Sequence, residues 1–146
     1  MESSDDIFET SCEDEIAVLR EIFPDQVQDL RSSKHNSDGN YIPPKLTIKL
    51  WPQESRAITS SDYGIKLIIE LNRFYPKSEP ENLNISGING FRINDQKRQK
   101  LINVLIELSR EKLKQEQVYL YDLCVFTQEN LHRNVLHSSM YCYYIY

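Results

Sequence analysis

Apolar and polar residues alternate along two short runs in the first half of the chain. In KLTIKLW, residues 45–51, and in GIKLIIEL, residues 64–71, apolar side chains stand at every second position. A period of two is typical of strands with one buried face. The polar loop between the two runs favours an antiparallel pair. A shorter alternation at Leu83 and Ile85 predicts a third strand.

Elsewhere the apolar residues recur with a helical period. Ile16, Leu19 and Phe23 fall at i, i+3 and i+7, which predicts a first helix packed by one face. The tetrapeptide at residues 10–13, Thr-Ser-Cys-Glu, has the form of a capping box, so we expect this helix to begin at Thr10.

Two further helical stripes follow the strands. Asn94 or Asp95 can cap the first of the two helices. No Gly or Pro separates them, and we expect the break between them near residues 115–119. Their apolar stripes are Leu101, Leu105 and Leu108 in one helix, and Leu120, Leu123, Cys124, Thr127 and Leu131 in the other.

This order of elements predicts the fold class. Consecutive strands with helices at both ends indicate an α+β fold, with an antiparallel sheet of three or four strands, helices on one face and the order α-β-β-β-α-α. The 146 residues suit one domain. We expect it at residues 10–136, after a flexible acidic N-terminus (1–9) and before an aromatic tail (137–146) whose role the sequence leaves open.

Composition argues against three classes of protein: nucleic-acid-binding, membrane-spanning and secreted proteins. The net charge of −5 argues against nucleic-acid binding, which requires clustered Lys and Arg. No apolar run reaches the roughly 18 residues of a membrane span, and the N-terminus has no signal-peptide pattern. Three widely spaced cysteines fit free thiols in a reducing compartment. We therefore expect a cytoplasmic protein.

No residue pattern predicts catalysis. Cys124 lies on the apolar stripe of its helix, and His132 stands eight residues on, roughly 12 Å along the axis. We expect a buried, inert thiol. The three histidines, His35, His132 and His137, have no metal-binding spacing with a cysteine. No phosphate-binding loop follows Gly87. The sequence therefore predicts no cofactor, metal or catalytic residue.

The segment FYPKSEPENLNI, residues 74–85, follows the second strand directly. A hinge, a ligand groove and a structural lock are three possible roles. The alternation resumes at once, which argues against a hinge, and prolines four apart do not fit a Pro-rich ligand helix. A lock remains, because Pro76 and Pro80 fix φ and lower the entropy of the unfolded chain.

The order of these segments resembles the RWD domain family. The matching parts are EDEIAVLREIF, LTIKLWPQ and the Tyr-Pro-x-x-x-Pro motif at Tyr75, Pro76 and Pro80, and the resemblance covers roughly residues 10–136. It implies a fold like that of ubiquitin-conjugating enzymes, with a tight series of turns at the motif. It also implies that Tyr75 is an anchor, with a packed ring and a hydroxyl bonded to backbone.

The chain departs from the conjugating enzymes in what their chemistry requires. Those enzymes place a catalytic cysteine within a few tens of residues after the motif, accompanied by His-Pro-Asn. This chain has no cysteine between Tyr75 and Leu123 and no His-Pro-Asn. The resemblance therefore implies a non-catalytic domain that binds protein partners.

Within the family, the chain is most similar to the N-terminal RWD domains of amino-acid-starvation kinases. The shared features are LWPQ at residues 50–53 and VYLYDL at residues 118–123. Such domains dock a HEAT-repeat, ribosome-associated activator, although this chain has no kinase motif itself. An RWD module that recruits partners or substrates for a RING-type ubiquitin ligase is the alternative, and self-association stays possible.

The resemblance also implies a contact surface. The family's partner segment presents basic residues, so exposed acidic residues on the late helices are candidates: Asp122 first, at the acidic position of the last helix, then Glu116 and Glu129. The acidic N-terminus is a second candidate, with a solubilising tail as the other reading.

Overall fold

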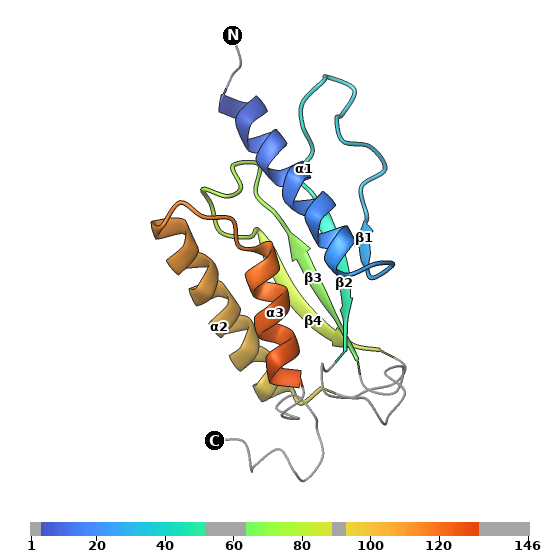
Figure 1. Ribbon diagram of the computed structural model, residues 1–146, viewed down its shortest axis with the longest axis vertical. Coiled ribbons are helices and arrows are strands. Elements are labelled where there is room, and N and C mark those ends of the chain that lie inside the picture. The colour runs from blue at the N-terminus through green and yellow to red at the C-terminus, as the bar shows by residue number, and fades with distance from the viewer. Residues whose placement is uncertain (1–3, 52–63, 89–92, 132–146) are drawn as a thin grey trace.

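The structure, a computed structural model, describes residues 4–51, 64–88 and 93–131 (Figure 1). Its elements follow one another as α1 (Ser4–Ile22), β1 (Val27–Asp29), β2 (Lys45–Leu50), β3 (Ile65–Glu70), β4 (Asn82–Gly87), α2 (Asp95–Lys114) and α3 (Leu120–Leu131). The four strands form one antiparallel sheet in the order β1-β2-β3-β4. The α+β class expected from the sequence is confirmed.

The three expected strands are β2, β3 and β4. Lys45 pairs with Glu70 and Leu50 with Ile65, which fixes the register of β2 on β3. The period of two places the apolar residues of all three strands on one face. The buried set is Leu46, Ile48, Leu50, Ile65, Leu67, Ile69, Leu83 and Ile85.

The sequence left a fourth strand open but did not locate it. β1 spans only Val27–Asp29 and pairs with β2, with Val27 opposite Ile48. The observed order is therefore α-β-β-β-β-α-α. Because β1 offers a single apolar residue, it has no alternation that a sequence pattern could reveal.

The helix ends agree with the sequence at two places and differ at one. Asn94 caps α2 by accepting the backbone N–H of Lys97 at 3.0 Å, and α2 and α3 are separated at residues 115–119, as expected. The capping box at Thr10 is wrong, because α1 begins at Ser4 and Thr10 lies inside it. The proposed domain limits stay a prediction, and the tail at 137–146 lies outside the described residues.

The three helices cover one face of the sheet (Figure 1). α3 packs over β2, α2 packs over β4, and α1 contacts α3. The core lies between the sheet and these helices. Its helical members are Cys12, Ile16, Leu19 and Phe23 from α1, Leu101, Ile102 and Leu105 from α2, and Leu120, Leu123 and Cys124 from α3. None of the described helices is long and apolar enough to cross a membrane.

Candidate functional site on the helical side

The Tyr-Pro segment lies inside the molecule. Tyr75 is 1% exposed, and its ring meets that of Tyr119 edge-on with centroids 4.7 Å apart. The Tyr75 hydroxyl accepts the backbone N–H of Tyr119 at 2.9 Å and that of Leu120 at 3.2 Å. The packed ring and backbone-bonded hydroxyl implied by the resemblance are thus both present. The peptide bond between Tyr75 and Pro76 is cis.

A carboxylate from α1 meets the same end of α3. Glu15 is 8% exposed, and its Oε2 accepts the backbone N–H of Tyr121 at 3.2 Å. Its Oε1 is buried and has no hydrogen-bond partner among the described residues. Burial, followed by the negative charge of Asp122, raises the pKa of Glu15 to about 7. The start of α3 is therefore held by two buried side chains from other segments.

The three predicted contact residues lie outside this buried region. Asp122 is half-exposed, and its Oδ2 is 3.6 Å from the Lys112 ammonium. Glu129 is exposed on α3, seven residues or roughly 10 Å farther along the axis. Seven residues make about two turns, so both carboxylates lie on one side of α3.

Glu116 belongs to the connection between α2 and α3. It has a left-handed backbone, with φ of 54°, and its N–H bonds the carbonyl of Leu113 at 3.0 Å, while the N–H of Gln117 bonds that of Lys112 at 3.0 Å. This pattern is a Schellman turn, in which Gly is the usual residue at the left-handed position. Glu116 is exposed, and within the described ranges it makes no hydrogen bond or ion pair with Asp122 or Glu129.

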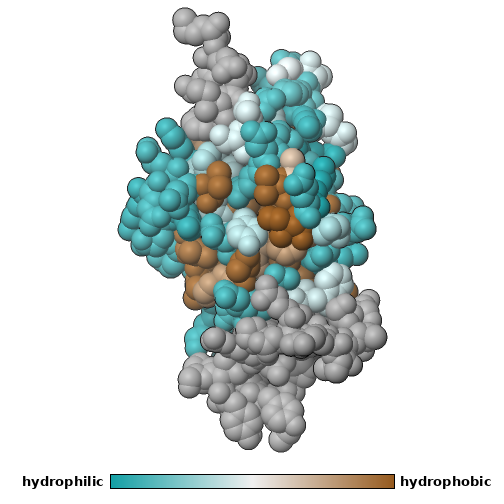
Figure 2. Space-filling model, in the orientation of Figure 1, coloured by the Kyte–Doolittle hydropathy of each residue, from teal (hydrophilic) through white to brown (hydrophobic). Residues whose placement is uncertain are grey.

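Exposed apolar residues lie on the same side of the molecule, and the sequence analysis missed them. Val18 and Ile22 on α1 are 49% and 45% exposed, and Val118 and Tyr121 near the start of α3 are 40% and 42% exposed. Figure 2 shows hydrophobic side chains near the middle of this face, with hydrophilic ones among and beside them. The sequence held one indication of this exposed surface. Val18 and Ile22 are spaced by one helical turn and lie beside the predicted buried stripe of α1.

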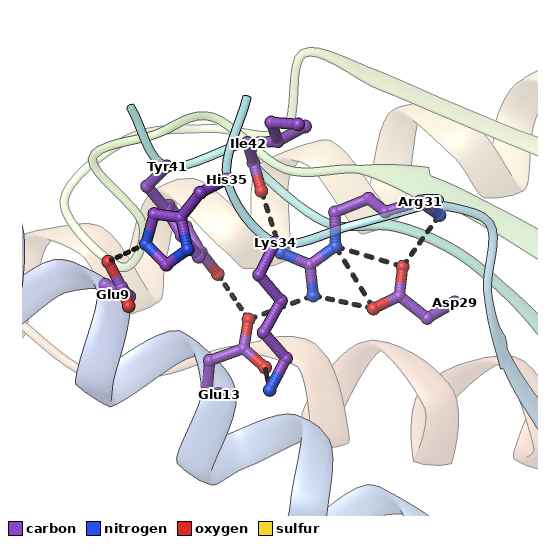
Figure 3. A network of polar contacts seen from close by, with 8 residues as sticks. All are labelled: Glu9, Glu13, Asp29, Arg31, Lys34, His35, Tyr41 and Ile42. Carbon is purple, nitrogen blue, oxygen red and sulfur yellow. Dashed lines mark hydrogen bonds and ion pairs between the residues drawn. The ribbon is translucent and has the colours of Figure 1, made fainter. Parts of the chain in front are cut away.

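A polar network ties the opposite side of α1 to the connection between β1 and β2 (Figure 3). The Arg31 side chain, 3% exposed, is at its centre. Its guanidinium donates to both carboxylate oxygens of Asp29, to Glu13 at 2.9 Å and to the carbonyl of Ile42 at 2.7 Å. The guanidinium also stacks over the Tyr41 ring, 5.5 Å from its centroid.

Glu13 is the member of this network that comes from α1. Besides Arg31 it accepts the Tyr41 hydroxyl at 2.6 Å and lies 3.2 Å from the Lys34 ammonium. Burial alone would raise the pKa of Glu13, but the bonds from Tyr41 and Arg31 outweigh it and hold the pKa below its usual value. One turn before Glu13, Glu9 bonds the His35 ring at 3.2 Å. Sequence reasoning did not find this network.

Both cysteines of the described ranges are free thiols in the core. Cys124 is fully buried, as expected, and burial raises the pKa of its thiol. Burial also raises the pKa of Cys12 to about 12. Within the described ranges, no group of three or more His, Cys, Asp or Glu could hold a metal ion. His132 and His137 lie outside these ranges.

A cavity of about 470 Å³ has none of the three predicted contact residues in its lining. It lies where the connection between β1 and β2 meets the ends of β3 and β4. Its lining residues are Leu30, Arg31, Ser32, Ile42, Pro43, Pro44, Lys45, Glu70, Leu71 and Glu81. The Arg31 guanidinium is engaged in the network. Of the other charged lining residues, Lys45 lies 4.0 Å from Glu70, and Glu81 accepts the Asn72 side-chain amide at 2.6 Å.

Comparison with known proteins identifies the fold family. The family model of the RWD domain matches residues 10–131. The solution structure of the RWD domain of mouse GCN2 is similar to this chain, with a TM-score of 0.63 and 22% sequence identity, over 92% of this chain and 89% of that one. No curated protein sequence gives a significant match. On the match to the family model, which spans most of its length, the chain belongs to the RWD domain family.

Proposed function

We propose that this domain is a non-catalytic docking module that binds a HEAT-repeat, ribosome-associated activator in cytoplasmic amino-acid-starvation signalling. As an RWD domain, the chain is a protein-interaction module, and domains of this family are generally non-catalytic. The LWPQ and VYLYDL segments support the assignment to starvation signalling.

The observation that carries the proposal is that the carboxylates on α3 and in the connection before it are exposed or half-exposed and have few or no ion-pair partners among the described residues. Glu129 is exposed and has no ion-pair partner within the described part of the chain, and the same holds for Glu116. Asp122 has only one lysine at 3.6 Å. Exposed carboxylates without partners can meet Lys and Arg of a docking protein, which raises the association rate and selects the partner.

The test is a pull-down of the activator's RWD-binding segment by the full chain. Asp122→Lys combined with Glu129→Lys is expected to abolish capture. Because Asp122 lies 3.6 Å from Lys112 and acts on Glu15, the melting curve of the variant is recorded as well, and capture is compared for the folded fraction. Asp38→Lys with Glu81→Lys is the matched control, since it makes the same change in net charge at exposed positions away from α3. Capture by the α3 double variant at the wild-type level would refute the proposed surface.

A further inference from the structure

We infer that the outer sides of α1 and α3 form an anchor for an amphipathic helix of a partner, with apolar residues at its centre and Lys or Arg along its edges. The helical-side patch is defined as Val18, Ile22, Val118, Tyr121 and the half-buried Val125. The inference rests on the docking function proposed above, because it assigns the apolar part of that contact and the class of the partner segment.

The exposed apolar residues are concentrated at this patch. Seven large hydrophobic side chains are exposed in the described part of the chain, and four of them are patch members. Single exposed hydrophobics are ordinary, but a group of them on one face marks an interaction site. Figure 2 shows several hydrophobic areas near the middle of this face, with hydrophilic side chains between and beside them.

The packing of α1 explains why Val18 and Ile22 point outward. The core takes Cys12, Ile16, Leu19 and Phe23, which leaves the neighbouring stripe of Glu15, Val18 and Ile22 toward α3. Glu15 contacts α3 through the Tyr121 N–H, and Val18 lies about one turn beyond Glu15 on the same side.

The packing of α3 leaves a second outer stripe beside the first. Leu120, Leu123, Cys124 and Thr127 are buried, so Tyr121 and Val125, one turn apart, face away from the sheet. α1 and α3 lie side by side in Figure 1 and contact one another. Each helix therefore contributes a pair of apolar residues spaced by one turn. Such spacing suits the i, i+3 and i+4 anchors of a bound helix.

The charges around the patch select a basic partner. Asp14 and Glu21 on α1 and Glu129 on α3 are exposed and have no ion-pair partner among the described residues. The positive charge of Arg20 acts on Asp29, on the β1 side of α1. An apolar centre with an unpaired acidic border is complementary to a helix with an apolar stripe and basic flanks.

The acidic residues around the helical-side patch argue against two other binding partners for it, namely a second copy of the chain and the chain's own aromatic segment. In a symmetric dimer through this patch, the carboxylates of one copy would face those of the other, which is repulsive. The aromatic segment MYCYYIY at the end of the chain has no basic residue to pair with them.

The first experiment locates binding with two synthetic helical peptides of about 14 residues, or about 21 Å of helix. Both have the same Leu stripe, flanked by Lys in one and by Glu in the other. In methyl NMR of the full chain, the Lys-flanked peptide is expected to shift the methyl signals of Val18, Ile22, Val118 and Val125 saturably, and the Glu-flanked peptide is not. Absence of shifts, shifts centred elsewhere, or equal responses to both peptides would each overturn the inference.

Paired variants then separate the patch from the rest of the surface. Val18→Ser with Ile22→Ser is expected to weaken binding of the Lys-flanked peptide at least tenfold with an unchanged fold. Leu30→Ser with Val104→Ser is the control, because these residues are similarly exposed, at 45% and 43%, and lie outside the patch. Equal losses in both pairs would contradict the inference. A dimer that dissociates in Val18→Lys would show that a second copy is the occupant.

The activator segment distinguishes failure of this inference from failure of the proposed function. If the segment loses binding to Asp122→Lys with Glu129→Lys but not to Val18→Ser with Ile22→Ser, the docking function stands and the apolar anchor is refuted. If the segment does not bind the wild-type chain while the Lys-flanked peptide maps to the patch, the anchor stands and the proposed partner is refuted.

Discussion

The two sides of α1 use acidic residues in opposite ways. Toward the connection between β1 and β2, Glu13 is bound by Arg31, Lys34 and Tyr41, and every partner belongs to the same chain. Toward α3 and solvent, Asp14 and Glu21 have no ion-pair partner within the described residues. The number of acidic residues is therefore a poor guide to a docking surface. The two sides differ in whether their carboxylates already have ion-pair or hydrogen-bond partners within the chain. We call them the satisfied side and the unsatisfied side.

The largest loss of stability is expected from breaking the Arg31 network on the satisfied side of α1. Arg31→Ala leaves the carboxylates of Glu13 and Asp29 without their guanidinium, and removal of one partner of a buried ion pair costs about 4 kcal/mol. Urea unfolding should show this loss, and Arg31→Lys should recover only part of it, because an ammonium cannot make the same forked contacts. Binding of the Lys-flanked peptide by the folded fraction should be unchanged. A selective loss of binding would contradict the division between the two sides.

The second effect is a pH dependence of the domain's stability that comes from Glu15 on α1. The pKa of Glu15 is 4.5 in its ordinary state and about 7 in the folded chain. The group therefore favours folding below pH 4.5, and this contribution is lost as the pH rises through about 7. Over that range the loss amounts to about 3 kcal/mol.

Glu15→Gln removes the titration but keeps an oxygen for the Tyr121 N–H. We expect the difference in unfolding free energy between the variant and the wild type to grow in favour of the variant from pH 5 to pH 8. The raised pKa values of Cys12, Tyr119 and Cys124 keep these neighbours neutral over that range. Asp122, the remaining charged neighbour, needs Asp122→Asn as a control. A constant difference across the range would contradict the prediction.

The third effect concerns the buried phenol behind α3. Tyr75→Phe removes the acceptor of two backbone N–H groups, at Tyr119 and Leu120. Leaving buried donors without an acceptor should lower the unfolding free energy by about 2 kcal/mol. Partner binding should fall only in proportion to the unfolded fraction. A variant that loses binding with an unchanged melting curve would instead place the motif in the contact surface.

The smallest effect is a gain in stability from a substitution at Glu116, in the connection between α2 and α3. Glu116 has a left-handed backbone that favours Gly, so Glu116→Gly should stabilise the domain by about 1 kcal/mol. Glu116→Ala keeps the strain while removing the charge and serves as the control. If Glu116 contacts the activator segment, both variants should weaken its capture while only Glu116→Gly raises the melting temperature.

The sequence predicted those parts of the fold that a local period encodes. The alternation in β2 and β3 and the helical stripes of α2 and α3 depend on neighbours along the chain, and the Tyr75 anchor followed from a short motif in a fixed place. β1 was missed because three residues with one apolar side chain carry no period. The start of α1 was misplaced because the Thr10-to-Glu13 spacing matches a capping box, whereas the helix already begins at Ser4 and Glu13 binds Arg31.

The candidate site was predicted less completely than the fold. Asp122, Glu116 and Glu129 could be proposed as exposed acidic residues, but the sequence does not show which carboxylates already have partners. The Arg31 network joins residues 18 and 28 positions from Glu13. Likewise, Val18 and Ile22 could have been core residues, and only the packing of α1 on the sheet shows that they are exposed.

The start of α3 has a consequence for how the domain opens. The first N–H groups of a helix have no partner within the helix, and here those of Tyr119, Leu120 and Tyr121 bond to Tyr75 and Glu15, which are 44 to 106 residues away along the chain. α3 therefore cannot fray from its first turn without releasing both α1 and the Tyr-Pro segment. In hydrogen exchange, these three amides should become accessible together with the core of α1, as one cooperative unit.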